Sequence, residues 1–216
     1  MDESIAVTAS LSSEHKEILH LMSKIWPDPP CFLWYTTPFS LLVAVVLSAQ
    51  STDQRVNRIM PGLVCVANTP EKMLFLGKEK LLPMIRSIGL YRRKADYIMM
   101  LSQELIDWYS GCLPQDLKSL MRLSGVGQKT ANVVLNVVFG QPTIPVDTHV
   151  FRVARRMGFS LASTVGDVEK ELNDLVPMPW KKNLHTWFIL HGRTYCKARQ
   201  PKCSACPFSK HCPSRQ

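Results

Sequence analysis

Apolar positions repeat with helical spacing along most of the chain. Between residues 13 and 26 they include Ile18, Leu19, Met22 and Ile25, which share one face of a helix with 3.6 residues per turn. The strict alternation that indicates half-buried strands is weak throughout. We therefore predict an all-α chain with short connections. The predicted helices cover residues 13–26, 38–47, a segment from 51 onward, 69–76, 77–88, 92–109, 117–123, 128–139, 148–157, 165–176 and 181–195.

Prolines and capping residues set the predicted helix limits. Prolines at 27, 29 and 30 end the first helix, because proline cannot continue the backbone hydrogen bonding. Ser51 and Gln54 have the spacing of a capping box at a helix start. The longest apolar run, 41–47, is far shorter than the roughly 20 residues of a membrane span, and it predicts a buried helix. The segment 140–145, with two prolines and a glycine, is a candidate hinge between two helical lobes.

Charge and cysteine content narrow the function classes. The 216 residues carry a formal net charge of +9, which favours a polyanionic partner such as nucleic acid, although basic charge also serves solubility alone. Asp2 and Glu3 and the lack of a long apolar run argue against a signal peptide. We expect a soluble cytoplasmic protein whose thiols stay reduced. Seven cysteines then point to a metal or to catalysis rather than to disulfides.

Four of the cysteines lie close together near the C-terminus. Cys196, Cys203, Cys206 and Cys212 are separated by six, two and five residues, and prolines between them predict a loop. Structural zinc sites with four cysteines usually have two short chelating pairs, whereas this loop has one. We therefore favour an iron–sulfur cluster, with zinc as the alternative. Residues 192–216 contain six lysines and arginines and no acidic residue. This composition suits a phosphate backbone, or alternatively a merely solvated basic tail.

A second motif, Leu-Ser-Gly-Val-Gly-Gln-Lys-Thr-Ala, covers residues 123–131. Gly125 and Gly127 lie between two predicted helices, where glycine lets a phosphate approach the backbone and the next helix N-terminus attracts an anion. We predict a helix–hairpin–helix that binds DNA without reading bases. Lys129, in the first turn of its second helix, is either a phosphate contact or a nucleophile. A helix N-terminus and partial burial both disfavour the ammonium form, which suits a nucleophilic amine.

A third motif, Val-Asp-Thr-His, covers residues 146–149. Asp147 directly precedes a predicted helix, so we expect it to be the N-cap. Its carboxylate can also stabilise an oxocarbenium-like sugar or relay a proton, and the two roles are compatible. We expect His149 to orient or pack rather than to catalyse.

These motifs, together with 47–53 (Leu-Ser-Ala-Gln-Ser-Thr-Asp) and 88–91 (Ile-Gly-Leu-Tyr), occur in one order with family-like spacing. From about Thr37 to Cys212 the chain resembles the bacterial endonuclease III family of DNA glycosylases. The resemblance implies two α-helical lobes with DNA between them. One is a six-helix barrel with the helix–hairpin–helix, over residues 31–141. The other is a [4Fe-4S] cluster lobe formed by both chain ends, residues 1–30 and 142–216.

The resemblance also implies residue roles. Lys129 matches the Schiff-base lysine and Asp147 the catalytic aspartate; Gln50 fills the space of the flipped nucleotide and Leu90 is an apolar wedge. The four loop cysteines match the [4Fe-4S] ligands. The residues expected to contact DNA are Gln50, Leu90, Gly125, Val126, Gly127, Thr130 and His149. The implied activity is removal of oxidised or ring-saturated pyrimidines from double-stranded DNA, and β-elimination at abasic sites, by a monomer in a bacterial-like, nucleoid-associated setting.

Some features depart from the family or leave alternatives. Ser124 stands where the family often has proline, and Gln128 where it often has a basic residue. The chain ends four residues after Cys212, so we expect no further lesion-recognition domain. An adenine glycosylase or a mismatch thymine glycosylase of the same superfamily is disfavoured by Lys129. A non-catalytic, cluster-bearing DNA-binding protein would not need Lys129 and Asp147 together. We expect Cys31, Cys65 and Cys112 to be ordinary buried thiols, and the cluster to be structural.

Overall fold

The computed structural model describes residues 10–216. Asp2 and Glu3, on which the signal-peptide prediction depends, lie outside them. Within the described part the chain forms ten α-helices, two short 3-10 helices and no strand, so the all-α prediction is confirmed. The α-helices are α1 (Ser13–Ile25), α2 (Pro38–Ser48), α3 (Asp53–Val66), α4 (Pro70–Met84), α5 (Tyr91–Tyr109), α6 (Leu117–Arg122), α7 (Gln128–Phe139), α8 (Thr148–Arg156), α9 (Val165–Leu175) and α10 (Met178–Thr194).

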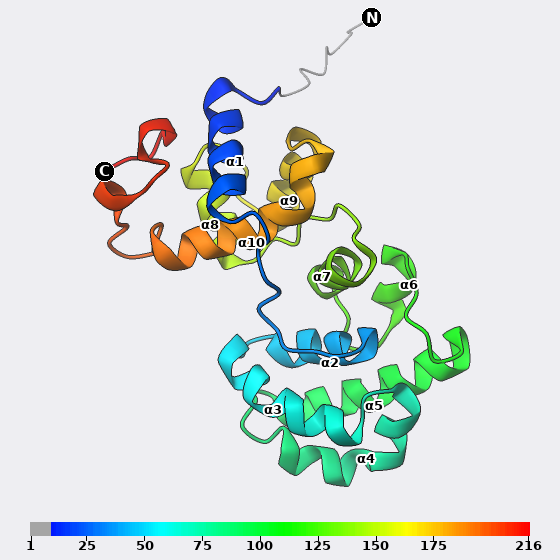
Figure 1. Cartoon of the computed structure of the whole chain (residues 1–216). Helices are drawn as coiled ribbons and strands as arrows, with labels where there is room; N and C mark the ends of the chain where they lie inside the picture. The colour runs from blue at the N-terminus through cyan, green and yellow to red at the C-terminus, as the bar shows by residue number, and fades with distance from the viewer. Residues whose placement is uncertain (1–9) are drawn as a thin grey trace, which may run out of the picture. The chain divides into compact units, whose positions relative to one another are not determined.

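The chain divides into two compact units. One is Cys31–Gln141, and the other combines the described residues up to Pro30 with Pro142–Gln216. Figure 1 shows the first unit as the group α2 to α7 and the second as α1 with α8 to α10 and the C-terminal loop. The candidate hinge at 140–145 contains the point where the chain passes from one unit to the other.

Helix α2 is the core of the unit Cys31–Gln141. Every residue from Phe39 to Leu47 is buried, which confirms the buried helix predicted from the apolar run. A helix that is apolar on all sides must be covered on all sides, and α2 packs against α3, α5 and α7. Helix α4 packs along α5, and α6 packs on α7. Helices α3, α5 and α7 thus surround α2.

Two predicted helix starts in this unit differ from the structure. The capping box at Ser51 is wrong, because the hydroxyl of Thr52 is the N-cap of α3 and accepts the N–H of Arg55. The Ser51 hydroxyl instead accepts the N–H of Gly89, at 3.3 Å. The two helices predicted over 69–88 are α4 with a break at Gly77, whose φ of 76° and ψ of 157° are not helical.

The second unit joins the two ends of the described chain. The indole N–H of Trp187, on α10, donates to the carbonyl of Trp26 at the end of α1, at 2.8 Å. Phe208, in the C-terminal loop, is fully buried, and its ring centroid lies 6.2 Å from that of Trp26. Helix α1 therefore holds the loop in place, as the adjacent blue and red segments of Figure 1 show. Among the described residues, no helix is both long and apolar enough to cross a membrane.

Replacing a core residue of α2 should test the central position of this helix. Leu42 is fully buried, so Leu42→Ala removes apolar contacts and leaves a cavity, and we expect a loss of about 2–5 kcal/mol of unfolding free energy. Phe75→Ala is the control in the same unit, because Phe75 is 92% exposed and its loss should change stability by less than about 0.5 kcal/mol. Denaturant unfolding followed by circular dichroism measures both, and equal effects would contradict this packing.

Candidate active site and cysteine loop

A tight turn joins α6 to α7 and forms the predicted hairpin. The N–H of Leu123 donates to the carbonyl of Leu120, and the N–H of Val126 donates to the carbonyl of Leu123, both at 3.1 Å. Gly125 has a φ of 77°, a region that residues with a Cβ rarely adopt. A Cβ at this position would also lie 2.7 Å from the Tyr97 side chain on α5. The turn therefore requires glycine both for its backbone and for its packing.

The first turn of α7 follows this hairpin directly. Gly127 is the N-cap residue and supplies no side-chain capping bond, an arrangement that suits a phosphate oxygen. Lys129 is exposed, so the predicted partial burial is wrong. Thr130 is half-buried, and Val126 is buried with its side chain in the core. A DNA contact by Val126 would therefore involve its main chain, and it stays a prediction.

Gln50 and Leu90 occupy two loops of the same unit. Both have left-handed backbone conformations, with φ values of 55° and 57°, which are uncommon for residues other than glycine and occur often at functional sites. Gln50 is exposed, and Leu90 is 58% exposed despite its apolar side chain. Together with Gly125 they line a cavity of about 180 Å³. Three of the residues expected to contact DNA are thus brought to one place.

Asp147 caps α8 in the other unit. Its Oδ1 accepts the N–H groups of His149 and Val150, each at 2.8 Å, which confirms the predicted N-cap. The cap fixes the orientation of the carboxylate, and both bonds use the same oxygen. Beside it, His149 Nδ1 lies 3.2 Å from the guanidinium of Arg152 on the same helix. This contact fits the expectation that His149 orients or packs.

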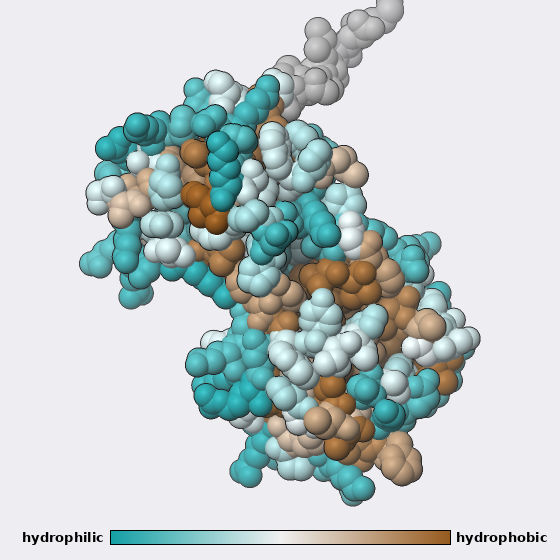
Figure 2. Space-filling view, viewed as in Figure 1, coloured by the Kyte–Doolittle hydropathy of each residue, from teal (hydrophilic) through white to brown (hydrophobic). Residues whose placement is uncertain are grey.

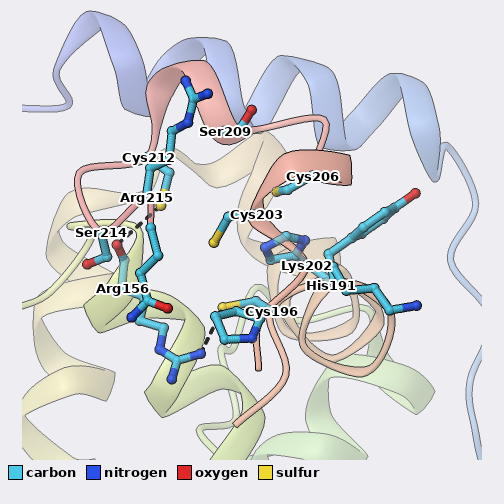
Figure 3. Close-up of a pocket in the computed structure, with 13 residues that line it drawn as sticks. Arg156, His191, Cys196, Lys202, Cys203, Cys206, Ser209, Cys212, Ser214 and Arg215 are labelled. Carbon is cyan, nitrogen blue, oxygen red and sulfur yellow. Dashed lines mark hydrogen bonds between the residues drawn. The ribbon is translucent and has the colours of Figure 1, made fainter. Parts of the chain in front are cut away.

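The four cysteines of the C-terminal loop line one cavity of about 210 Å³. Figure 3 shows their sulfur atoms around this space, with Arg156 from α8 and His191 from α10 beside them. The loop contains two 3-10 turns, Cys203–Ala205 and Ser209–His211. The guanidinium of Arg156 donates to the carbonyls of Lys197 and Ala198, at 2.7 and 3.1 Å, and lies 3.6 Å from Cys196 Sγ. Helix α8 thereby holds the start of the loop.

The donor set of this cavity fits a cluster. No three His, Cys, Asp or Glu side chains in the described part of the chain converge closely enough for a single metal ion. A cluster does not need that convergence, because each of its irons binds a separate thiolate. Burial, followed by the charges of the neighbouring cysteines, raises the pKa of Cys206 and of Cys212, so bound iron would offset the cost of holding thiolates here.

His191 gives a second observation at the same cavity. Its side chain is buried, and burial lowers its pKa to about 4, so that the ring is neutral at pH 7. Its Nδ1 has no hydrogen-bond partner within the described structure. Buried polar atoms are usually satisfied, and a sulfur atom of a bound cluster would be an acceptor for an N–H at this point. The residues present therefore fit the group.

The surface around the loop is hydrophilic over much of the face seen in Figure 2. All six lysines and arginines predicted to make this region basic are exposed. The prediction for the other three cysteines is wrong, since Cys31, Cys65 and Cys112 are all exposed. Burial of a cysteine depends on its tertiary neighbours, which the local sequence does not reveal.

Comparison with known proteins defines the family. Residues 43–178 match the HhH-GPD superfamily of base excision DNA repair proteins. Endonuclease III of Rickettsia conorii is 49% identical over 196 residues, covering 91% of this chain and 93% of that protein. Endonuclease III of Escherichia coli K12 is 46% identical, covering 91% and 93%. The chain belongs to the endonuclease III family.

Solved structures agree with this assignment. A trapped covalent intermediate of endonuclease III with DNA matches with a TM-score of 0.86 and 44% identity, covering 94% of this chain and 97% of that one. A thermostable thymine-DNA glycosylase matches with a TM-score of 0.83 at 23% identity, covering 94% and 96%, which shows the shared fold alone. As a member of the endonuclease III family, this chain is a base-excision DNA glycosylase and abasic-site lyase.

In this chain, the hairpin is held to α5 by two hydrogen bonds from Ser124 that a proline could not make. We call this pair of bonds the anchor. Ser124 donates its N–H and its hydroxyl to the two carboxylate oxygens of Glu104 on α5, at 2.7 and 2.6 Å. A proline at this position has neither donor. Hydrogen bonds to an ionised carboxylate are stronger than neutral ones. The departure from the family pattern at Ser124 is thus matched by a carboxylate that accepts both of its donors.

A double-mutant cycle should measure this anchor. We expect Glu104→Gln to cost about 1–3 kcal/mol of unfolding free energy, because the replacement presents an N–H₂ group to one of the two donors of Ser124. Combining it with Ser124→Ala should give a coupling energy of about 0.5–3 kcal/mol. Gln103→Ala, at an exposed position of the same helix, should show no coupling to Ser124→Ala. A Glu104–Ser124 coupling near zero would contradict the anchor.

Proposed function

We propose that this chain is a bifunctional glycosylase that removes oxidised or ring-saturated pyrimidines from double-stranded DNA, acting as a monomer, and then cuts the strand through an imine on Lys129. The position of Lys129 carries the proposal. It stands in the first turn of α7, directly after a glycine hairpin whose form suits a phosphate, and its amine is exposed. The family match supports the same chemistry.

The reaction follows from an amine attacking the sugar. The Lys129 amine, once deprotonated, forms a bond to C1′ while the bond to the base breaks, and the base leaves with the electron pair and takes up a proton. Loss of the remaining amine proton and opening of the C1′–O4′ bond give the imine, with the proton going to O4′. The imine acidifies C2′; removal of a C2′ proton expels the 3′-phosphate, and water then releases the lysine.

Asp147 assists this chemistry as a fixed carboxylate. Its Oδ1 is used by the cap of α8, and Oδ2 takes no part in those two bonds. A carboxylate held in this way can stabilise positive charge that develops on the sugar, or accept a proton from the attacking amine. A rigid cap keeps the group oriented without cost at the moment of reaction.

The target base must leave the duplex before Lys129 can reach its sugar. Flipping costs a few kcal/mol, and least for a damaged base. We assign Gln50 to the space left by the nucleotide and Leu90 to the wedge between bases, because both are exposed on strained loops around one cavity with Gly125. The hairpin and the basic surface bind the phosphate backbone. Bound DNA would then cover the Lys129 side chain during the reaction.

We further propose that Cys196, Cys203, Cys206 and Cys212 hold a [4Fe-4S] cluster. When bound, the cluster would supply four iron–sulfur bonds that cross-link the C-terminal loop. The residues of the chain itself organise the loop around it, since Arg156 holds the backbone after Cys196 and Phe208 anchors the middle of the loop in the core. The role of this loop is then to present its basic surface to the phosphate backbone.

Borohydride trapping tests the catalytic proposal. We expect wild-type protein to form a covalent adduct with duplex DNA that carries thymine glycol, and Lys129→Gln to form none, because a carboxamide cannot form an imine. Lys72→Gln, at an exposed position on α4, should keep the wild-type yield. Denaturing electrophoresis measures the adduct. A wild-type protein that excises no base, or forms no adduct, would sink the bifunctional mechanism and favour a non-catalytic DNA-binding protein.

Metal content tests the cluster. The purified protein should be yellow-brown, with broad visible absorbance and equal amounts of iron and sulfide. Cys203→Ser should lose most of this absorbance because one ligand is removed, while Cys65→Ser, at an exposed cysteine outside the loop, should keep it. Elemental analysis and absorbance spectra give the result, and a colourless protein loaded with zinc would refute the assignment.

A further inference from the structure

Helix α5 buries a lysine beneath the loop that carries Gln50. Lys94 is only 4% exposed, although lysine is almost never buried without partners. Its ammonium donates to the carbonyl of Leu47 at 2.9 Å, to the carbonyl of Ala49, and to the hydroxyl of Ser51 at 3.4 Å. All three acceptors are uncharged oxygens, in the last turn of α2 or in the loop directly after it. Burial lowers the pKa of Lys94.

The end of α2 is a favourable place for this charge. The last carbonyls of a helix have no partners within the helix, and they carry the negative end of its dipole. Helix α2 has no basic residue in its last turn, so Lys94 supplies the cation from the neighbouring helix. Because its partners include Leu47 and Ala49, the ammonium fixes the point at which the chain leaves α2 and enters Gln50.

The same contacts reach the loop of Leu90. The Ser51 hydroxyl, which accepts from Lys94, also accepts the N–H of Gly89 at 3.3 Å. A Cβ at Gly89 would lie 3.2 Å from the carbonyl of Gln50, so the two loops approach each other closely. Lys94, Ser51 and Gly89 therefore form a continuous polar link beneath the two loops. We call this link the loop clamp.

Both loops need such support. Gln50 and Leu90 each hold a left-handed backbone conformation, which is strained for a residue with a Cβ. Strained conformations persist only where the surroundings determine them. Lys94 and both residues line the same cavity of about 180 Å³. The loop clamp is thus in a position to fix the orientations of Gln50 and Leu90 relative to each other.

We propose that Lys94 is a positioning residue whose ammonium, through Ser51, holds Gln50 and Leu90 in register so that both enter the duplex together. The inference rests on the proposed function, which assigns those two side chains to the opened base stack. Lys94 itself touches neither the sugar nor the base. Its loss should therefore impair opening of the duplex and spare the reaction of the Lys129 amine with an accessible sugar.

The test uses the full-length protein with its cluster and compares its activity on two DNA substrates. One is a duplex with thymine glycol, which requires base flipping, and the other is a single strand with a preformed abasic site, which does not. Lys94→Met keeps an unbranched side chain but removes the ammonium. We expect its single-turnover excision from the duplex to fall about 10- to 100-fold, while strand cleavage at the single-stranded site stays within about twofold. A 2-aminopurine opposite the lesion should also lose its rise in fluorescence.

Ser51→Ala is the second variant, because it removes only the link between the loops and leaves the bonds of Lys94 to Leu47 and Ala49. It should show the same selective loss on the duplex, which keeps the test decisive if Lys94→Met does not fold. Lys78→Met is the matched control. Lys78 is half-exposed and pairs with Asp96 at the surface of the same unit, so both substrates should react at the wild-type rate.

The outcomes separate the clamp from the proposed function. A wild-type duplex rate in a folded Lys94→Met, or in Ser51→Ala if Lys94→Met does not fold, would overturn the positioning role. An equal loss on both substrates would also overturn it, because that pattern indicates general damage to the site. A wild-type protein that forms no adduct with either substrate would instead contradict the proposed function. Selective loss on the duplex alone supports the clamp.

Discussion

The burial of α2 is the constraint on which the unit Cys31–Gln141 depends. Residues Phe39–Leu47 of this helix are buried on every side, so α3, α5 and α7 must surround them. That enclosure has a chemical consequence at the C-terminal end of α2, where carbonyls without helical partners would lose hydrogen bonds to water. Lys94, on α5, donates a hydrogen bond to one of these carbonyls, that of Leu47. The same enclosure brings the hairpin next to α5, where Tyr97 packs on Gly125 and Glu104 accepts from Ser124.

Local sequence predicts the helices well because their signals are local. Helix α7 begins and ends at the predicted residues, Gln128 and Phe139, since a glycine stands on each side of an apolar period. The N-cap role of Asp147 is equally local, because a carboxylate before a helix meets free N–H groups within three residues. Ser51 shows the limit of this reasoning. Ser51 and Thr52 are both competent N-caps, and the choice depends on Gly89, which is 38 residues away in sequence.

The parts of the site that the sequence did not reveal all depend on tertiary contacts. From the sequence alone, Lys94 looks like one more basic residue of an amphipathic helix, and its role is clear only once α2 is packed against it. Glu104 likewise looks like an exposed acid until the hairpin is packed against α5. The motif itself identified Lys129, but its exposure depends on which neighbours surround α7. The same holds for Cys31, Cys65 and Cys112, whose type suggested burial and whose positions are at the surface. Motifs thus identify chemical groups, while packing determines their surroundings.

Helix polarity links these features to a nucleic-acid partner. The hairpin presents the N-terminus of α7, whose partial positive charge attracts phosphate. Gln50, in contrast, follows the C-terminus of α2, and the partial negative charge of that helix end would repel a phosphate. If Gln50 enters DNA as proposed, this helix end would face a polyanion, so its partial negative charge would disfavour binding. The ammonium of Lys94 lies directly on those carbonyls and offsets their charge from inside the protein. A buried cation at this point therefore serves the electrostatics of the loop as well as its geometry.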